Sequence, residues 1–500
     1  MLVRTDDKTI EDNERDLPIP TQLVSNGEYW PVPQNRRQRQ IEELTLSMAD
    51  ERARKLGVSR RSFLRSAAGT ATALMALNIA NGCGDDDDGG FAVDECHTRD
   101  PEAARERFQA DFFIVDVQTH HADLDGPVGT VPILGDFYSS FRICYPGMPL
   151  PDCNPMELNE LSRLNYIKEV LVDSETSVAM MSGIPAPNAS IELIGNEAMA
   201  ATRDLGNELG ASQRMLTQAM LMPNQPVNDT RSTIEDMEWL VETLGIRALK
   251  TYTGAGHRGE DPATAVWGDT QPWWLDDEEV AYPMYEEALR LGINIVNTHK
   301  GLRLGIFDRE HIHPRDVRKA VLDWPEMNFA IYHSAGEFLD ELVEIRRNLP
   351  AERTNLYAEL GAIFASSVIS GDIDQTGHLL GKLLTSFGAE RILWGTDSIW
   401  YGTPQWQIDA LKTFRMPQRL MDEFGYPEVT DEIKARIFGL NAADLYGIDS
   451  EAVRCTIAQD PIAMLKNDYD SEKHRSLRTY GPKTRREFLQ MNYSGKPAHV

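Results

Sequence analysis

The chain has too few basic residues to balance its acidic ones. Its 500 residues include 50 Lys and Arg against 78 Asp and Glu, which gives a formal net charge of -28 at pH 7. This charge opposes binding to nucleic acid and to anionic membranes, because like charges repel. The uncharged stretch at 66–84 is too short and too rich in Ala and Thr for a membrane span, which needs about 20 apolar residues. We therefore expect a soluble protein with a small-molecule or protein partner and no nucleic-acid partner.

Cysteine is also scarce, and the five cysteines define no disulfide pattern. Cys144 and Cys153 bracket a turn-rich loop that a disulfide could close. With Cys96 and Cys455 they make four, which allow three pairings, and the sequence selects none of them. Free thiols are the alternative.

A Gly-rich phosphate loop is missing after the first apolar run, where an open doubly wound sheet would usually carry one. Between residues 111 and 448, short apolar runs instead alternate with longer helical patterns, which is typical of repeated βα units. The eight apolar runs span 112–117, 177–181, 215–221, 246–251, 293–298, 328–332, 355–359 and 391–395. Eight parallel strands separated by helices predict an α/β fold, a (β/α)8 TIM barrel whose catalytic groups lie at the C-terminal ends of the strands.

The regions outside this alternation are interpreted separately. Residues 1–84 are a predicted leader, 85–110 a linker, 111–448 the barrel, and 449–500 a C-terminal extension that wraps the surface or an adjacent subunit. The longest insertions, at 123–173 and 252–279, follow the first and fourth strands and predict a wall over the substrate. Trp267, Trp273 and Trp274 either line that wall or pack against the barrel rim.

The leader contains Ser59-Arg60-Arg61-Ser62-Phe63-Leu64 before the uncharged stretch, an arrangement that resembles a twin-arginine export signal. It predicts an exported protein, periplasmic or extracytoplasmic, with the export machinery as a partner. The alternative is an amphipathic surface helix with a basic start. The signal lies unusually deep in the chain, so Met48 is an alternative start. Cys83 is a candidate for lipid anchoring, although residues 80 and 81 depart from the usual attachment box.

Four polar motifs stand at the ends of strands one, five, six and eight. They are Asp116-Val-Gln118-Thr-His120-His121, Asn297-Thr-His299, Ile331-Tyr-His333 and Trp394-Gly-Thr-Asp397. Each motif offers a residue that can bind a metal ion or move a proton. At the C-terminal ends of barrel strands, such residues gather in one site.

These motifs resemble those of the amidohydrolase superfamily, in particular the amidohydrolase-related branch that contains aminocarboxymuconate-semialdehyde decarboxylase. The resemblance spans about 111–448 and includes the closing segment Ile437-Phe-Gly-Leu-Asn441-Ala-Ala-Asp-Leu-Tyr-Gly447. It implies one divalent metal ion, zinc before manganese. The implied ligands are His120, His299 and Asp397, with Gln118 in the place of the family's first histidine. Because a neutral amide oxygen is a much poorer zinc donor than imidazole, the site either binds metal more weakly or has lost it.

The resemblance also implies roles for these residues. A metal-bound water has its pKa lowered from about 15.7 toward about 7 and becomes a nucleophile. Asp397 can take the proton of this water and return it to a leaving group, and His333 can stabilise charge on a substrate oxygen. By their positions alone, Lys250 at the end of strand four and Lys300 after His299 are candidates to bind a substrate carboxylate, with surface or helix-pairing roles as the alternative. Glu359 ends strand seven and is a candidate to orient a ligand.

His121 is expected to pack away from the site, because successive strand residues point to opposite faces.

The leading hypothesis is a metal-dependent hydrolase that acts on a small C–N, C–O (ester or lactone) or C–C substrate. The first alternative is a non-oxidative decarboxylase on the same scaffold, which releases carbon dioxide and consumes no water. The second is an exported binding protein with a degenerate metal site. The resemblance also implies a homodimer whose neighbouring subunit completes the site.

Overall fold

The computed structural model describes most of the chain. The described residues are 17–24, 31–83, 89–123, 161–189, 192–257, 267–302, 307–469, 471–477, 479 and 483–485. Cys144, Cys153 and most of the first insertion lie outside these residues, so the disulfide between the two cysteines stays a prediction. Cys96 and Cys455 are exposed thiols that form no disulfide.

All eight predicted strands are present, and every hydrogen-bonded neighbour pair among them is parallel. They are β2 (Val115–Thr119), β3 (Val178–Met181), β4 (Met215–Thr217) with β5 (Ala219–Met220), β6 (Leu249–Tyr252), β7 (Ile295–His299), β8 (Asn328–Tyr332), β9 (Leu356–Glu359) and β10 (Ile392–Leu393). One residue separates β4 from β5, so these two pieces form the third strand and join the sheet β2-β3-β4 to the sheet β10-β9-β8-β7-β6-β5.

The ring is completed where strand eight meets strand one. The N–H of Val117 donates to the carbonyl of Trp394 (3.0 Å), and the N–H of Asp397 donates to the carbonyl of Gln118 (3.0 Å). A parallel bridge between Thr119 and Ser398 continues this pairing. The predicted (β/α)8 barrel is therefore confirmed, and its last seam lies beside the predicted site.

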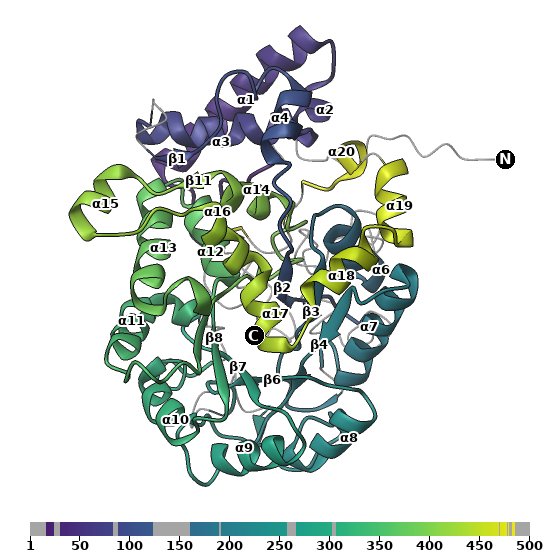
Figure 1. The fold of residues 1–500 in the computed structure, drawn as a ribbon, viewed down its shortest axis with the longest axis vertical. Coiled ribbons are helices and arrows are strands. Elements are labelled where there is room, and N and C mark those ends of the chain that lie inside the picture. The colour runs from purple at the N-terminus through teal and green to yellow at the C-terminus, as the bar shows by residue number, and fades with distance from the viewer. Residues whose placement is uncertain are drawn as a thin grey trace, which may run out of the picture.

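Helices cover the outside of the strands in the order expected for βα units (Figure 1). They are α6 (Arg163–Ile167), α7 (Asn196–Gly210), α8 (Met237–Glu242), α9 (Ala281–Arg290), α10 (Val317–Asp323), α11 (Leu339–Arg347), α12 (Gly361–Ile369), α13 (Ile373–Phe387) and α14 (Gln405–Thr413). In α13, the N-cap Asp372 accepts a hydrogen bond from the backbone of Asp374, and leucines three and four residues apart are buried. Such a face explains why the sequence pattern located these helices.

The barrel interior has its own core, formed by alternate residues of the strands. Val115 and Val117 of strand one belong to it, together with Ala330 and Tyr332 of strand six. The helix α17 (Asn441–Tyr446) contributes to this core and donates a hydrogen bond from the Tyr446 hydroxyl to Asn297 (3.0 Å). Because the interior is filled with side chains, it leaves room for chemistry only at the strand ends.

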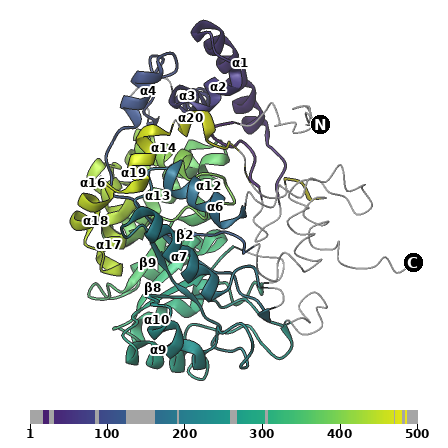
Figure 2. The same cartoon turned by 90° about the vertical axis from the view of Figure 1, so that its right-hand side faces the viewer.

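Described segments between residues 418 and 474 form short helices on the surface, some of which Figure 2 shows. They are α15 (Gln418–Phe424), α16 (Asp431–Ala435), α18 (Ser450–Ile457), α19 (Pro461–Asp468) and α20 (Ser471–His474). A buried ion pair between Arg214 and Asp460 (2.6 Å) fixes the start of α19 to the barrel. That the whole extension at 449–500 wraps the surface stays a prediction.

The N-terminal part of the chain is folded as well. It contains α1 (Arg36–Leu56), α2 (Arg60–Arg65), α3 (Ala67–Asn81), β1 (Gly90–Phe91) and α4 (Pro101–Phe108), and β1 pairs antiparallel with β11 (Phe414–Arg415). These helices form a layer at the top of the view in Figure 1, on the side of α13 and α14. Within the described part of the chain, no helix combines the length and the apolar character that crossing a membrane requires.

Candidate active site

Four of the predicted site residues meet at the seam between strands one and eight. Gln118 and His120 come from the end of strand one, His333 from the end of strand six and Asp397 from the end of strand eight. All four side chains are at most 2% exposed. His120 Nε2 lies 3.1 Å from Asp397 Oδ1. The convergence follows from the barrel, which brings the C-terminal ends of distant strands to one place.

The amide of Gln118 lies at the centre of this group. Its Nε2 is 3.2 Å from Asp397 Oδ1, 3.3 Å from His333 Nε2 and 3.5 Å from His120 Nε2. An amide NH2 has two hydrogens, so it can satisfy at most two of these three acceptors. Gln118 Oε1 is buried and has no hydrogen-bond partner among the described residues. A buried carbonyl oxygen without a partner costs about 1–3 kcal/mol, which a bound cation would offset.

His120 is held in one orientation by the barrel. Its Nδ1–H donates to the carbonyl of Ser182 (2.7 Å), and its ring stacks near Trp400 with 6.1 Å between centroids. This leaves Nε2 as the nitrogen that faces Asp397. A ring lone pair and a carboxylate oxygen at this distance repel unless a proton or a metal ion lies between them. Fixing the far nitrogen of a histidine on a carbonyl is also how proteins orient metal ligands.

His299 lies beside this group, with its Nε2 turned to its own loop. Its Nε2–H donates to the carbonyl of Leu302 (2.7 Å), and its ring stacks on Tyr252 with 4.7 Å between centroids. Its ring is 4.9 Å from that of His333, edge to face. Among the described residues, no set of three ligand atoms within 4.8 Å of one another includes His299. The structure thus brings together three of the four predicted metal ligands.

Burial disfavours the charged form of both imidazoles on this side of the site. Burial lowers the pKa of His299 well below its usual range, and the nearby Lys250 ammonium lowers this pKa further. Burial also lowers the pKa of His333 well below its usual range, followed by the effect of His299. Neutral imidazoles can both donate and accept a hydrogen bond.

Backbone strain is concentrated at two of the site residues. His333 has φ 58° and Asp397 has φ 57°, and Ser334 and Ala335 continue the left-handed region after His333. Non-glycine residues in this region cost on the order of 1–3 kcal/mol each and persist only where the surrounding structure holds them. The fold therefore holds the two predicted catalytic side chains in strained backbone positions.

Glu359 forms hydrogen bonds with the backbone of His333 and of Gly361. Its Oε2 accepts the backbone N–H of His333 (2.8 Å), and its Oε1 accepts the N–H of Gly361 (2.6 Å). A Cβ at Gly361 would lie 2.7 Å from His333 Nδ1 and 2.9 Å from Gln118 Oε1, so glycine is needed there. Burial raises the pKa of Glu359 to about 8. This carboxyl group accepts hydrogen bonds from the backbone on both sides of the site, and its predicted role in orienting a substrate stays a prediction.

The two predicted lysines differ. Lys250 is fully buried, and its Nζ lies 3.6 Å from the centre of the Tyr332 ring, close enough to affect His299 and His333. Lys300 is also buried, but its Nζ pairs with Asp316 (2.7 Å) and donates to the carbonyl of His311 (2.8 Å). The structure brings Lys250 to the site and does not bring Lys300, because an ion pair within its own loop holds that ammonium.

The other singled-out residues pack. His121 Nε2 bonds to the Thr202 hydroxyl (2.8 Å), its ring lies against Tyr166, and burial lowers its pKa to about 4. Trp267 and Trp273 are buried, and Arg315 covers the ring of Trp274 at 3.9 Å. The rim-packing alternative therefore describes these tryptophans.

Sequence reasoning missed the residues that hold the site from behind. Asp116 accepts the backbone N–H of Thr396 (3.0 Å) and that of Gln118 (3.2 Å), so it ties strand one to strand eight. Its pKa is raised to about 7 by burial. Asp116 opens the first motif, so the signal was present, but Ser182 and Trp400 carry no pattern of their own in the sequence.

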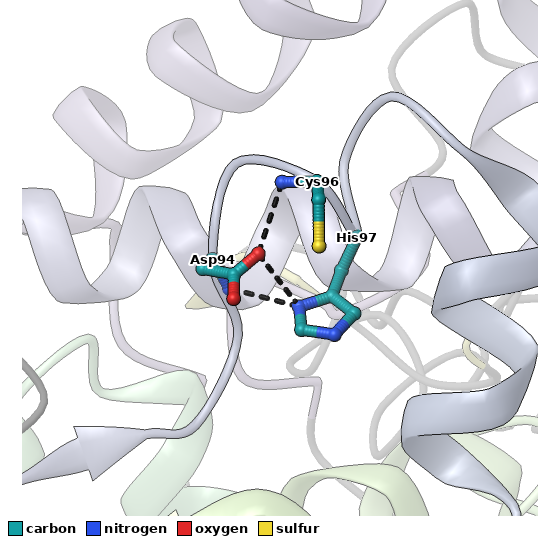
Figure 3. Close-up of side chains that lie close together, drawn as sticks. All are labelled: Asp94, Cys96 and His97. Carbon is teal, nitrogen blue, oxygen red and sulfur yellow. Dashed lines mark hydrogen bonds and ion pairs between the residues drawn. The ribbon is translucent and has the colours of Figure 1, made fainter.

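A second group of potential metal ligands lies outside the barrel. Asp94, Cys96 and His97 have ligand atoms within 4.8 Å of one another, in the turn before α4 (Figure 3). Asp94 accepts the N–H of Cys96 (2.9 Å), and His97 Nδ1 accepts the N–H of Asp94 (3.0 Å). These short-range hydrogen bonds of the turn account for the cluster without a metal ion.

One protein-family model matches the second half of the chain. The family model described as "Amidohydrolase" matches residues 197–448, just over half of the chain. None of the curated proteins matches the chain.

Solved structures with some likeness include three TIM-barrel or decarboxylase proteins. An uncharacterized TIM-barrel protein from Bordetella bronchiseptica is 17% identical, with TM-score 0.41, covering 69% of this chain and 99% of that one. A 2,6-dihydroxybenzoate decarboxylase from Rhizobium is 16% identical, with TM-score 0.38, covering 68% and 100%. A 5-carboxyvanillate decarboxylase from Novosphingobium aromaticivorans, complexed with manganese, is 12% identical, with TM-score 0.41, covering 68% and 97%. At these TM-scores the family match carries the assignment and the structural likenesses do not.

Proposed function

The chain belongs to the amidohydrolase family, and we propose that it is a metal-dependent hydrolase that adds water to a small C–N, C–O or C–C substrate. The observation that carries this proposal is the buried meeting of His120, Asp397 and Gln118 at the strand ends. The imidazole nitrogen of His120 and the carboxylate oxygen of Asp397 face each other there. Rotating the Gln118 amide, whose Nε2 now faces them, would present its oxygen as a third donor to a divalent cation.

These three residues would hold the metal ion, and His299 is the candidate for a further ligand. When bound, a divalent ion lowers the pKa of a coordinated water toward neutrality and polarises a substrate oxygen. Two oxygen donors favour a harder ion such as manganese more than a set of imidazoles would, whereas His120 and His299 suit zinc. Metal analysis of the purified protein decides between the two ions.

The chain's own residues supply the proton transfers and the orientation of the substrate. Asp397 is a general base for the attacking water and returns the proton to the leaving group. The neutral imidazole of His333 can donate a hydrogen bond to the substrate oxygen on which charge develops. Glu359 accepts a hydrogen bond from the backbone of His333. The imidazole is therefore already positioned before the substrate binds, which reduces the entropy cost of the reaction.

Lys250 favours a substrate with a carboxylate. Its ammonium is buried and acts to lower the pKa of both His299 and His333. The same feature supports the second candidate function, a non-oxidative decarboxylase, since such an enzyme must hold the carboxylate that it removes. The two reactions differ in product, because only the decarboxylase releases carbon dioxide.

The test is a screen of esters, lactones, amides and aromatic carboxylates against the metal-loaded protein, with acid release and carbon dioxide followed in parallel. Hydrolysis that is lost in Asp397→Asn and retained in Asp94→Asn supports the proposal. If carbon dioxide is released and this release is lost in Asp397→Asn, the reaction is decarboxylation and not hydrolysis. Turnover that survives in Asp397→Asn would refute both reactions at this site.

A further inference from the structure

The segment that resembles an export signal is folded into the enzyme. Helix α3 carries no charged residue, and ten of its fifteen residues are buried. Its Ala71, Leu74 and Leu77 belong to the same core cluster as Leu380 of α13 and Ile408 of α14. A cleavable signal needs its apolar helix to be accessible, whereas this helix is covered by the rest of the chain.

Polar side chains fix α3 at specific points of the barrel's outer layer. The Asn78 side chain accepts the N–H of Phe91 (3.0 Å) and donates to the carbonyl of Phe91 (2.7 Å). Phe91 lies in β1, which pairs with β11 directly after α14. At the end of α3, the Asn81 side chain donates to the carbonyl of Gly371 (2.8 Å).

Helix α1 also bonds to the turn between α12 and α13. Gln38 donates from Nε2 to the carbonyl of Ile369 (2.9 Å), and Arg37 pairs with Asp372 (3.0 Å). A Cβ at Gly371 would lie 2.6 Å from the Ile41 side chain, so the two surfaces meet without a gap. Side-chain anchors from α1 and α3 therefore converge on residues 369–373, between α12 and α13.

The helices of this segment also approach each other closely. A Cβ at Gly69 would lie 2.4 Å from the carbonyl oxygen of Phe63, so α3 turns back tightly on α2. From the C-terminal extension, Arg475 donates to the carbonyl of Arg65 (2.9 Å) and Glu472 accepts the N–H of Ala67 (3.2 Å). The segment thus touches both the barrel and the C-terminal extension.

We propose that residues 36–81 are a permanent layer of the folded enzyme and are retained in it. Removing them would expose the apolar faces of α13 and α14. It would also leave the carbonyls of Ile369, Gly371 and Phe91 without the side-chain donors that pair them. Through α14 the layer reaches the site: Gln407 donates to the carbonyl of Thr396 (3.2 Å), next to Asp397. If residues 36–81 are a retained layer, the mature protein still contains them; if they are a cleaved twin-arginine signal, its N-terminus lies after them.

The first test is the intact mass and N-terminal sequence of the protein made from its full coding sequence in a bacterium with a twin-arginine export system. The layer predicts a chain that still contains residues 36–81. It also predicts that Arg60→Lys with Arg61→Lys leaves the mass and the cell compartment unchanged. A mature N-terminus beyond residue 81, or a change of compartment in the paired-lysine variant, would overturn the proposal.

The second test does not depend on the cell. A protease site is inserted between Gly82 and Gly89, and the folded protein is cut there. The N-terminal fragment is expected to stay bound through gel filtration and to separate only in denaturant. Release of the fragment under native conditions, with the thermal midpoint of the remaining barrel unchanged, would contradict a structural layer.

Discussion

Among the described residues, two groups of side chains have the atoms of a metal site, and they differ in how far apart their members lie in the sequence. Gln118, His120 and Asp397 come from opposite ends of the barrel sequence, are nearly inaccessible to solvent and lie where two strands close the ring. Asp94, Cys96 and His97 come from one exposed turn. Ligand atoms that are close together are thus weak evidence for a site when a local turn explains them. Buried polar groups from distant segments need a stronger cause, because burying them without partners is costly.

The largest expected effect separates the two groups by activity. Asp397→Asn keeps the size of the side chain and removes its basicity, so we expect kcat/KM to fall on the order of 10²–10⁴-fold. The matched change in the exposed turn, Asp94→Asn, is expected to leave kcat/KM unchanged. Both are measured on the substrate found in the screen, with the thermal midpoint as the check of folding. Equal losses in the two variants would remove the distinction.

The second effect concerns metal affinity. Gln118→His replaces the amide oxygen by an imidazole nitrogen, so zinc is expected to bind about 10–100-fold more tightly. The readout is the zinc-to-protein ratio after dialysis against a series of chelator concentrations. His97→Ala is the control and should leave this ratio as it is. If the zinc-to-protein ratio drops in His97→Ala and stays constant in Gln118→His, the metal ion binds at the exposed turn and not at the strand ends.

Burial also predicts a pH effect away from the site. Asp409 in α14 is buried, and desolvation raises its pKa from 3.8 to about 7. The folded state therefore keeps a proton that the unfolded state has lost between these values, so stability from this group is present at low pH and declines as pH rises toward about 7. The decline is about 1.4 kcal/mol per pH unit within this window.

The variant Asp409→Asn should remove that slope, measured as the difference in urea-unfolding free energy from wild type at several pH values. In the exposed turn, the hydrogen bond from Cys96 lowers the pKa of Asp94, so its effect has the opposite sign. A difference between Asp409→Asn and wild type that does not vary with pH would show that Asp409 is ionised when folded.

The smallest expected effect is that of Cys96→Ser. Serine keeps the size and the polarity of an exposed thiol, so the unfolding free energy should change by no more than about 0.5 kcal/mol. Metal content should also be unchanged. A loss of bound metal in this variant would give the turn a role that its hydrogen bonds do not require.

Much of the barrel could be predicted from the sequence because each strand is a short apolar run that ends on a polar residue. The same regularity located Gln118, His120, His333 and Asp397, since barrel strands end on one side. The orientation of side chains could not be predicted this way. His299 stands at the expected strand end, but the carbonyl of Leu302 takes its Nε2–H, and Asp316 takes the ammonium of Lys300.

The structure of the N-terminal segment could not be predicted from the sequence for a different reason. An apolar helix after paired arginines has the composition of an export signal, and it also has the composition of a core helix. Only the contacts of Asn78 and Gln38 with distant backbone distinguish the two, and such contacts leave no periodic signal in a single sequence. The export prediction and the homodimer prediction stay predictions.

The most direct test of the central claim is to locate the metal ion itself. Crystals of the protein grown with manganese or zinc, measured at the absorption edge of that metal, give an anomalous difference map. We predict one strong peak between His120, Asp397 and the side-chain oxygen of Gln118. A peak at Asp94, Cys96 and His97 with none at the strand ends would contradict the account.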